Sequence, residues 1–518
     1  MYDPNNFNLN TATDGVRDIR DDVYTGNLDV KRRFNFLPFP FAVQVGGGLR
    51  ENERDRTLPS EIYTHQGVNG DRSSAPYLAR VYANQPMRYN DVSQGVPSLS
   101  TYRAYEAWQD NPSLFTMTPA QVVAAAINRV QTSENIKETV GSYYFLTEAR
   151  LFKNRLQVLT GVRYETTTDD GSGALRDDSA VFVRNADGTF ARNAAGARIR
   201  KPEAGAVGSL QEAQLVYRER GYHAKRSYDG YYPSLHLTFN VTNNFLARAA
   251  YAKTYGRPAF ADIIPNAVTS ENDVDPGANR DAELGTITVR NTGLLPWSAE
   301  NFDLSLEYYT NNGGTFGASL FHKEITDFFG QFQKIATLED LAALGLDSRY
   351  EGWRVSTRTN AGDASVSGLE LSLSHSLRPL GEWARNFKGF VNATKLRLRG
   401  AQEANFTGFL PESMNWGITF APKRFTAMAK WNYRSAERRG LIAAFGPDAN
   451  QYYKARTHLD INLSYSFTPN LALFLNARNV MGVADVNLIK GSQVPSYAEQ
   501  SQIQDYGVPF SIGLKGSF

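Results

Sequence analysis

The sequence predicts an all-β fold, an antiparallel transmembrane β-barrel, on three observations. Short segments along the chain alternate apolar and polar residues with period two, as half-exposed strands do. The connections between these segments are short and long in turn, which is typical of outer-membrane barrels. Aromatic residues make up 12% of the 518 residues, and they favour strands over helices.

The composition of the chain limits the classes of function that we expect for it. No window holds the roughly 18 consecutive apolar residues of a membrane-spanning helix, and the mean hydropathy is −0.42. The net charge is +2 without a basic stripe, so we expect no nucleic-acid partner. The chain has no cysteine, its six histidines lack metal-ligand spacing, and no nucleophile or phosphate-binding motif occurs in context. We therefore expect no catalytic site, no metal and no cofactor.

Residues 1–518 show no shift in composition and no linker, and they are expected to form one β structure. Met1 to Asn6 contain neither a basic segment nor an apolar core, so an export signal is not predicted there. Because a barrel must be exported, we expect that the natural start lies upstream or that the sequence is a fragment.

The predicted strands share one property. Every second residue is apolar (the apolar parity), and the residues between them are polar or small (the polar parity). The clearest examples are 156–165, 235–241, 302–308, 369–374, 414–420, 459–467 and 506–518. Tight turns such as 152–154, 242–244, 311–314, 421–424 and 468–470 connect them to the next strands. Counting hairpins back from the C-terminus gives about fifteen strands, the first near 18–32 and the second near 41–53.

The other connections are long, and the sequence predicts them at 169–228, 256–299, 438–454 and 482–505. Two segments on such connections have helical spacing. Thr118 and Pro119 open an apolar run to Ile127, and a second run covers Leu338 to Leu346. We expect short helices there, whose plainest role is loop packing. A third feature, the triplet Gly46–Gly48 inside a strand, predicts a bulge or a close backbone approach.

The charged members of the polar parity should face the lumen, because a charge in hydrocarbon costs about 2–4 kcal/mol at the bilayer midplane. These residues are Arg163, Glu165, Arg248, Asp303, Glu307, Glu370, Lys430, Asp460 and Arg478. Their mixed signs predict ion pairs that brace the wall. The opposite parity should be exposed outward, and its members include Leu237, Phe239, Leu304, Leu306, Leu371, Ile461, Leu463 and Leu514.

Aromatic and basic residues on the predicted outer loops are candidates for ligand capture. They are Trp297, Trp353, Arg438, Arg439, Tyr452 and Tyr453. Packing within the loops would explain the same residues equally well.

The second half of the chain resembles a TonB-dependent outer-membrane receptor. The segments that carry the resemblance are YAKTYGRPAFADIIPN (251–266), NTGLLPWSAENFDLSLEYY (291–309), FHKEITDFF (321–329), NAGDASVSGLELSL (360–373), FLNARNVMG (474–482) and the terminal strand. Together with a weaker match over 138–168, they cover most of the chain after about residue 135.

The resemblance implies a barrel of about 22 strands in the outer membrane of a Gram-negative bacterium. It also implies energised uptake of a scarce nutrient such as an iron chelate, a vitamin or an oligosaccharide. In that family a plug fills the lumen, and the TonB complex acts on a segment ahead of the plug. This sequence shows neither, so residues 1–518 would be the C-terminal portion, about 15 of about 22 strands, without the plug. Lumen charges would then brace the wall or contact the plug.

The terminal strand also resembles the signal that the barrel-assembly machinery reads. Ser511, Gly513 and Phe518 stand at its polar, glycine and terminal aromatic positions, while Gly516 replaces a usual second aromatic. The implied partners are thus this machinery, outer-membrane lipid, the extracellular nutrient and, through a plug, the TonB complex.

Two alternatives remain open at this point. A passive porin-like or structural barrel would have the same strands without a plug. A soluble all-β carbohydrate-binding protein or enzyme would bury the apolar parity in a core, which is the same periodicity turned inside out.

Overall fold

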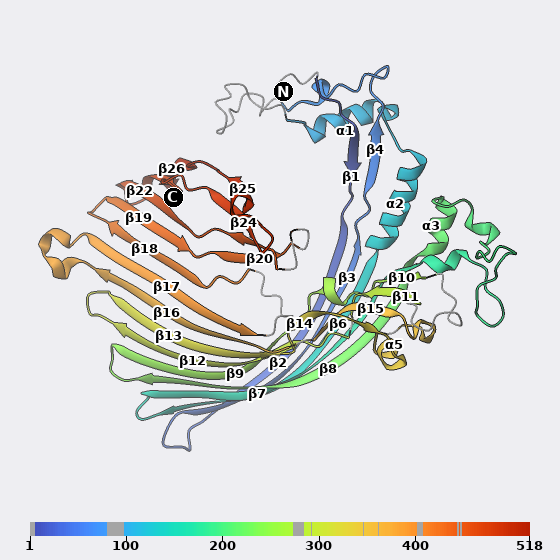
Figure 1. Cartoon of the computed structure of the whole chain (residues 1–518). Coiled ribbons are helices and arrows are strands. Elements are labelled where there is room, and N and C mark those ends of the chain that lie inside the picture. Colours follow the sequence, from blue (N-terminus) through green and yellow to red (C-terminus); the bar gives the residue numbers. More distant parts are fainter. Residues whose placement is uncertain are drawn as a thin grey trace.

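The computed structural model describes residues 6–79, 98–272 and 284–517, apart from 292, 345, 361, 401–407, 443, 444, 446 and 447. Within these residues one 19-stranded sheet dominates, and fifteen of its strands form a strongly curved wall of successive antiparallel neighbours (Figure 1). The wall strands are β2 (Asp18–Phe34), β3 (Phe41–Thr57), β6 (Glu134–Leu151), β7 (Leu156–Asp177), β8 (Tyr217–Asn240), β9 (Phe245–Gly256), β12 (Trp297–Tyr309), β13 (Thr315–Thr326), β16 (Ala364–Ser376), β17 (Phe387–Gly400), β18 (Glu412–Phe420), β19 (Phe425–Arg434), β22 (Arg456–Thr468), β23 (Leu471–Ala477) and β26 (Phe510–Gly516).

The remaining strands belong to the long connections. β10 (Ala267–Glu271), β11 (Gly285–Val289), β14 (Phe329–Ile335) and β15 (Arg354–Asn360) join the large sheet, partly through the parallel pairings β10–β7 and β11–β15. β1 (Thr11–Asp14), β4 (Glu61–His65) and β5 (Phe115–Thr116) form a three-stranded sheet. β20 (Glu437–Leu441), β21 (Asn450–Tyr453), β24 (Asp485–Lys490) and β25 (Gln500–Gln504) form a four-stranded one.

The predicted wall is confirmed from its first strand, since β2 and β3 lie where the hairpin count places them. The predicted tight turn after β6 is also present. Phe152, Lys153 and Asn154 adopt φ values of 52°, 58° and 67°, the left-handed conformation that a short hairpin connection needs.

One predicted boundary is wrong. The connection expected at 169–228 is shorter, because β7 and β8 stay paired up to Arg176 opposite Tyr217. This part of β7 is rich in Thr, Asp and Gly and has no apolar parity. Outside the hydrocarbon layer neither face of a strand has to be apolar, so backbone pairing continues where the periodic signal stops.

The register places the two parities on opposite faces of the wall. Leu304 pairs with Ala249 and with Leu320, whereas its neighbour Asp303 pairs with Ala250 and Phe321 on the other face. On the apolar face the exposed fractions are 48% for Leu304 and 67% for Leu514. Phe239, Leu306 and Leu371 are likewise exposed, and Leu237, Ile461 and Leu463 are half-buried. A soluble sheet stack would have buried these side chains in a core.

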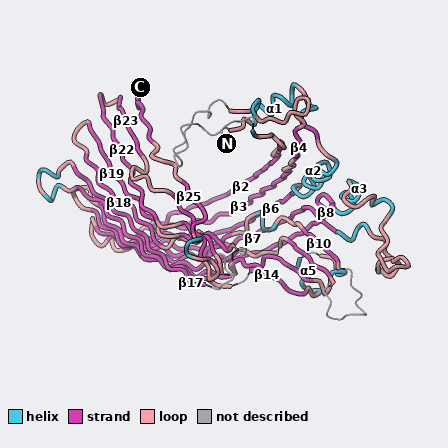
Figure 2. Tube along the Cα trace, turned by 45° about the horizontal axis from the view of Figure 1, so that its top comes forward, coloured by secondary structure: helices cyan, strands magenta, loops and turns pink. Residues whose placement is uncertain are grey.

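The ends of the wall are the strands β2 and β26. In the part of the chain that the structure describes, no pairing joins these two strands, so the wall is an open trough rather than a closed cylinder (Figure 2). An open wall is what the sequence predicts for fifteen strands of a larger barrel.

Helices cluster on the long connections, at the strand ends opposite the short turns (Figure 1). Both predicted helices are present, α2 (Pro119–Thr132) and α5 (Leu338–Leu344). At α2 the Thr118 hydroxyl accepts from the Gln121 amide, and the Gln121 side chain accepts from the Thr118 amide. The helices α1 (Thr101–Asp110), α3 (Leu210–Val216) and α4 (Phe260–Ile263) were not predicted. No helix in the described ranges has both the length and the apolar character needed to cross a bilayer.

The glycine triplet lies in regular register within β3, so the predicted bulge is wrong and the predicted close approach is confirmed. A Cβ atom on Gly46 would lie 2.2 Å from Asp29 Oδ1 and 2.5 Å from the Tyr144 ring. The missing side chain therefore leaves room for the Tyr144 hydroxyl to donate to Asp29 at 2.5 Å across three strands.

Candidate functional site

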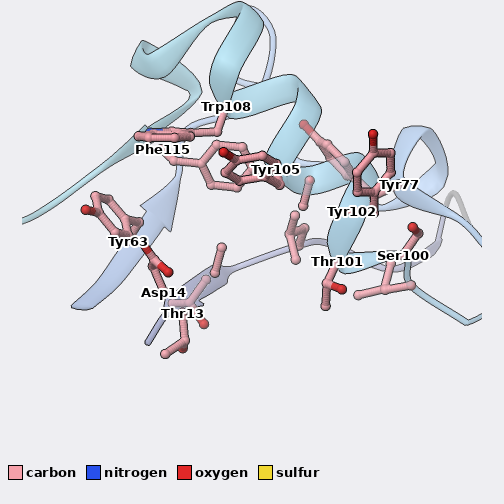
Figure 3. Close-up of a pocket in the computed structure, with 15 residues that line it drawn as sticks. Thr13, Asp14, Tyr63, Tyr77, Ser100, Thr101, Tyr102, Tyr105, Trp108 and Phe115 are labelled. Atoms are coloured by element: carbon pink, nitrogen blue, oxygen red, sulfur yellow. The ribbon is translucent and has the colours of Figure 1, made fainter. Parts of the chain in front are cut away.

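One candidate site is a pocket of about 590 Å³ at the loop end of the wall, between β1, β4 and α1 (Figure 3). A volume of this size suits a ligand of a few hundred daltons. Six aromatic side chains line it. They are Tyr63, Tyr77, Tyr102, Tyr105, Trp108 and Phe115. We call it the aromatic pocket.

Helix α1 supplies one wall of the aromatic pocket because its aromatic residues are spaced by three. Tyr102, Tyr105 and Trp108 share a helix face, and the Ser100 side chain caps the helix by accepting from the Arg103 amide. Tyr102 is 67% exposed, although it lies on the pocket. The Tyr105 and Trp108 rings lie 5.8 Å apart.

The sequence prediction missed this site. Its signal was present in the capping Ser100 followed by three aromatic residues at helical spacing, but this segment precedes the part of the chain that carries the family resemblance.

The floor of the pocket is a small core around His65. Its ring packs against Phe115 at 4.9 Å and against Tyr77 at 5.2 Å, and its Nε2 atom lies 2.9 Å from the Tyr77 hydroxyl. The other ring nitrogen lies 3.1 Å from the Leu9 carbonyl oxygen. These contacts join β4, β5 and the residues before β1 into one unit below the pocket.

We expect this floor to lose stability in mild acid. Burial, with a smaller contribution from Arg72, lowers the pKa of His65 although the Leu9 carbonyl opposes the change. The unfolded segment therefore binds more protons, so the stability is fully present above about pH 6.5 and falls as the pH drops below it. Hydrogen exchange of the β4 amides at pH 7.5 and 5.5, corrected for intrinsic rates, measures the effect. His65→Gln should abolish the pH dependence, whereas a change at the exposed His223 should preserve it.

The charge on the aromatic pocket is negative. Asp14 is the single charged residue among the lining residues that the structure describes, and it pairs across the β1–β4 ladder with Glu61. The Tyr63 hydroxyl donates to Glu61 Oε2 at 2.5 Å, and this bond together with burial raises the pKa of Tyr63 to about 12. At neutral pH Tyr63 is thus a protonated donor to Glu61.

Four of the six predicted ligand-capture residues lie together on the β20–β21 hairpin. Arg438 pairs with Tyr452 and donates to Asn450 at 2.8 Å. The Arg439 guanidinium lies over the Tyr453 ring at 4.6 Å and donates to Glu437 at 2.7 Å. These side chains already contact residues of the same hairpin, as the alternative of packing within the loops expects. Ligand capture by this hairpin stays a prediction.

The two predicted tryptophans lie elsewhere. Trp353 is 6% exposed and belongs to a buried cluster with Tyr350, Val355 and Ile287. Trp297 packs over Gly256, where a Cβ atom would lie 2.2 Å from its ring. Both positions fit the packing role that the sequence left open, and a role in ligand capture stays a prediction.

The predicted lumen residues share the polar face of the wall. Arg163 donates to Glu165 at 2.8 Å, and Arg248 pairs with Glu307. Asp460 accepts from the Asn432 amide group and from the Asn479 backbone at 3.0 Å each. By register Asp303, Glu370 and Lys430 point to this same face, while Arg478 directly follows the end of β23 and its lumen-facing position stays a prediction. That this face lines a closed lumen stays a prediction.

The strongest charge cluster on the polar face centres on a residue that the prediction missed. Arg257 donates to Glu138 at 2.9 Å, to Glu165 at 2.5 Å and to the Tyr255 hydroxyl at 2.7 Å. Glu138 and Glu165 are 6% and 5% exposed. No local pattern reveals this cluster, because its members lie on three segments far apart in the sequence.

The predicted assembly residues lie on the last strand. Ser511 pairs with Asn476, and Gly513 pairs with Phe474, whose ring would lie 2.8 Å from a Cβ atom on that glycine. Gly513 thus has a packing role, and its role in the assembly signal stays a prediction. Phe518 lies outside the described residues.

Several solved structures have a similar fold at low sequence identity. The closed form of the ferric-catecholate import receptor Fiu from E. coli K12 superposes with a TM-score of 0.55 at 12% identity, covering 97% of this chain and 55% of that one. The siderophore receptor PiuA from Acinetobacter baumannii gives 0.51 at 13% identity, covering 96% and 56%. The ferric citrate transporter FecA gives 0.51 at 10% identity, covering 97% and 55%. The chain therefore spans about half the length of the structures that it matches.

No curated protein matches the chain. The family model described as TonB dependent receptor-like, beta-barrel matches residues 2–480, which is most of the sequence. Both this match and the antiparallel wall confirm the resemblance seen in the sequence. The chain belongs to the TonB-dependent receptor-like β-barrel family.

Proposed function

We propose that the chain is part of an outer-membrane receptor that takes up a small extracellular ligand with energy from the TonB complex. Family membership over residues 2–480 carries the proposal. The wall supports it, since one face exposes leucines such as Leu304 and Leu514 while charged residues gather on the other. An exposed apolar face of this extent suits the outer-membrane lipid of a Gram-negative bacterium.

In this proposal the loop end of the wall faces the cell exterior and captures the ligand. The aromatic pocket is its candidate entry site, and the β20–β21 hairpin is a second contact surface. The plug, the remaining strands and the TonB-contacting segment belong to the proposal as parts of the complete receptor. The polar-face charges would then brace the wall or contact the plug, and Ser511, Gly513 and Phe518 would serve the barrel-assembly machinery.

The proposed chemistry is transport rather than catalysis, in keeping with the family. An iron chelate, a vitamin and an oligosaccharide are the candidate nutrients. The names of the similar structures, which include receptors for ferric catecholates and ferric citrate, favour a metal chelate among them.

Uptake in cells with and without a working TonB complex tests the proposal. Cells that carry the receptor gene are offered a panel of labelled iron chelates and vitamins, and accumulation is compared with that of a gene deletion. We expect accumulation of one compound that requires both the receptor and TonB. Accumulation that needs the receptor but not TonB would instead identify a passive barrel and contradict the proposal.

A matched pair of variants connects uptake to the aromatic pocket. Trp108→Ala removes a pocket aromatic, while Trp383→Ala removes an exposed tryptophan from the turn between β16 and β17. We expect the Km for uptake to rise about tenfold in the first variant, as for loss of one stacking partner, and to stay unchanged in the second. Equal Km values in both variants would show that the aromatic pocket has no role in uptake.

A further inference from the structure

We propose that the aromatic pocket binds a planar aromatic ligand that carries a positive charge. The inference deepens the proposed function by naming a ligand class, and it rests on that function only where uptake is concerned. Its basis is the combination of an aromatic lining with two carboxylates that have no lysine or arginine partner among the residues the structure describes.

The first observation is the shape and the chemistry of the pocket wall. Tyr105 and Trp108 from α1 face Tyr63 and Phe115 from the β4–β5 side, so ring faces and edges surround a space of about 590 Å³ (Figure 3). A pocket of this volume has room for a drug-sized ligand, including one with three or four fused or linked rings. Aromatic rings attract cations through their negative faces, most strongly for tryptophan.

The second observation is the pair Asp14 and Glu61. The two carboxylates stand directly opposite each other in the β1–β4 ladder, an arrangement that destabilises a strand pair unless a positive charge lies between them. Within the described ranges no lysine or arginine forms an ion pair with either of them. The buried carboxylates of the wall differ, since Arg257 serves both Glu138 and Glu165.

Together these observations indicate that the ligand carries a positive charge. A cation would gain from the rings and from Asp14 at the same time, whereas an anion of the same shape would meet both as repulsion. The pocket as described therefore does not complement a ferric tris-catecholate, whose deprotonated ligands leave a net negative charge.

Two dyes that differ in charge but share one skeleton test the inference. Rhodamine 123 is a cation and fluorescein methyl ester is an anion, and both carry the same xanthene rings and the same phenyl ester. Fluorescence anisotropy is measured with the full chain in detergent, and empty micelles provide the baseline. We expect rhodamine 123 to bind about tenfold more tightly than the anion.

Three variants assign the binding to the pocket. Trp108→Ala should weaken rhodamine 123 binding about tenfold, and Asp14→Asn should narrow the preference for the cation severalfold. Glu382→Gln, at an exposed carboxylate on the β16–β17 turn, should change neither. Asp14 is exposed and the change is isosteric, so it tests the charge without disturbing the fold.

Equal affinities for the two dyes, or a preference that survives Asp14→Asn and Trp108→Ala, would overturn the inference. The dye measurement involves neither TonB nor transport. Cation binding at the pocket combined with TonB-independent uptake would thus contradict the proposed function alone, while TonB-dependent uptake of an anion through an intact pocket would contradict the inference alone.

Discussion

Replacing Arg257 with alanine is expected to destabilise the folded protein by about 3–5 kcal/mol, the usual effect of removing one partner from a buried ion pair. Glu138 would remain as a buried carboxylate without a guanidinium, since the wall offers it no second arginine at hydrogen-bond distance among the described residues, whereas Glu165 would keep its pair with Arg163. The fraction of heat-modifiable folded protein across a urea series in detergent measures the change.

A neighbouring pair provides the control. Arg248 lies on β9, which ends just before Arg257, and it pairs with Glu307, but its side chain is 45% exposed, so Arg248→Ala should cost at most about 1 kcal/mol. Adding Glu138→Gln to Arg257→Ala should restore part of the loss because it removes the stranded charge. If both single variants unfold at the same urea concentration, the Arg257 cluster has no special role in stability.

Gly173→Ala should free a covering loop from the wall. A Cβ atom at this position would lie 1.9 Å from the carbonyl oxygen of Pro265, and a backbone atom cannot turn aside as a flexible side chain can. We expect a loss of about 1–3 kcal/mol, as for other overpacked contacts, and faster proteolysis within 259–266. Gly26→Ala is the control, since nothing lies within 4 Å of its Cβ position. A protected loop in the Gly173 variant would show that the contact is not needed.

The sequence predicts the wall well because the bilayer imposes a strict pattern on it. Hydrocarbon on one side allows only apolar side chains, so positions such as Leu304 and Leu306 reveal strand, face and register at once. Beyond the bilayer this constraint ends. The polar stretch of β7 from Thr166 to Asp177 stays paired with β8 as far as Arg176, with one register shift between Gly173 and Leu175, yet it carries no periodic signal.

The site is harder to predict, for two physical reasons. Aromatic residues serve packing and ligand capture with the same chemistry, so composition alone could not separate the buried Trp353 from the exposed Tyr102. Charge clusters depend on tertiary contacts, and Arg257 meets partners that lie 92 and 119 residues away. The four ligand-capture candidates on the β20–β21 hairpin, from Arg438 to Tyr453, do lie together in the structure. They do so because they are neighbours in a local ladder, which needs no distant contact.

The length of β3 affects the electrostatic potential around a ligand that approaches the aromatic pocket. Its 17 residues span about 55 Å, or roughly 40 Å of height at a tilt near 40°, while the apolar band of a barrel is about 25 Å tall. The aromatic pocket begins beyond the end of β3, so it stands on the order of 15 Å above the apolar band, which places it beyond the headgroup layer. Charges are screened over about 8 Å at physiological ionic strength. An approaching ligand therefore experiences the potential of Asp14 and Glu61 rather than that of the lipid headgroups, and a charge preference measured in detergent should hold at the cell surface.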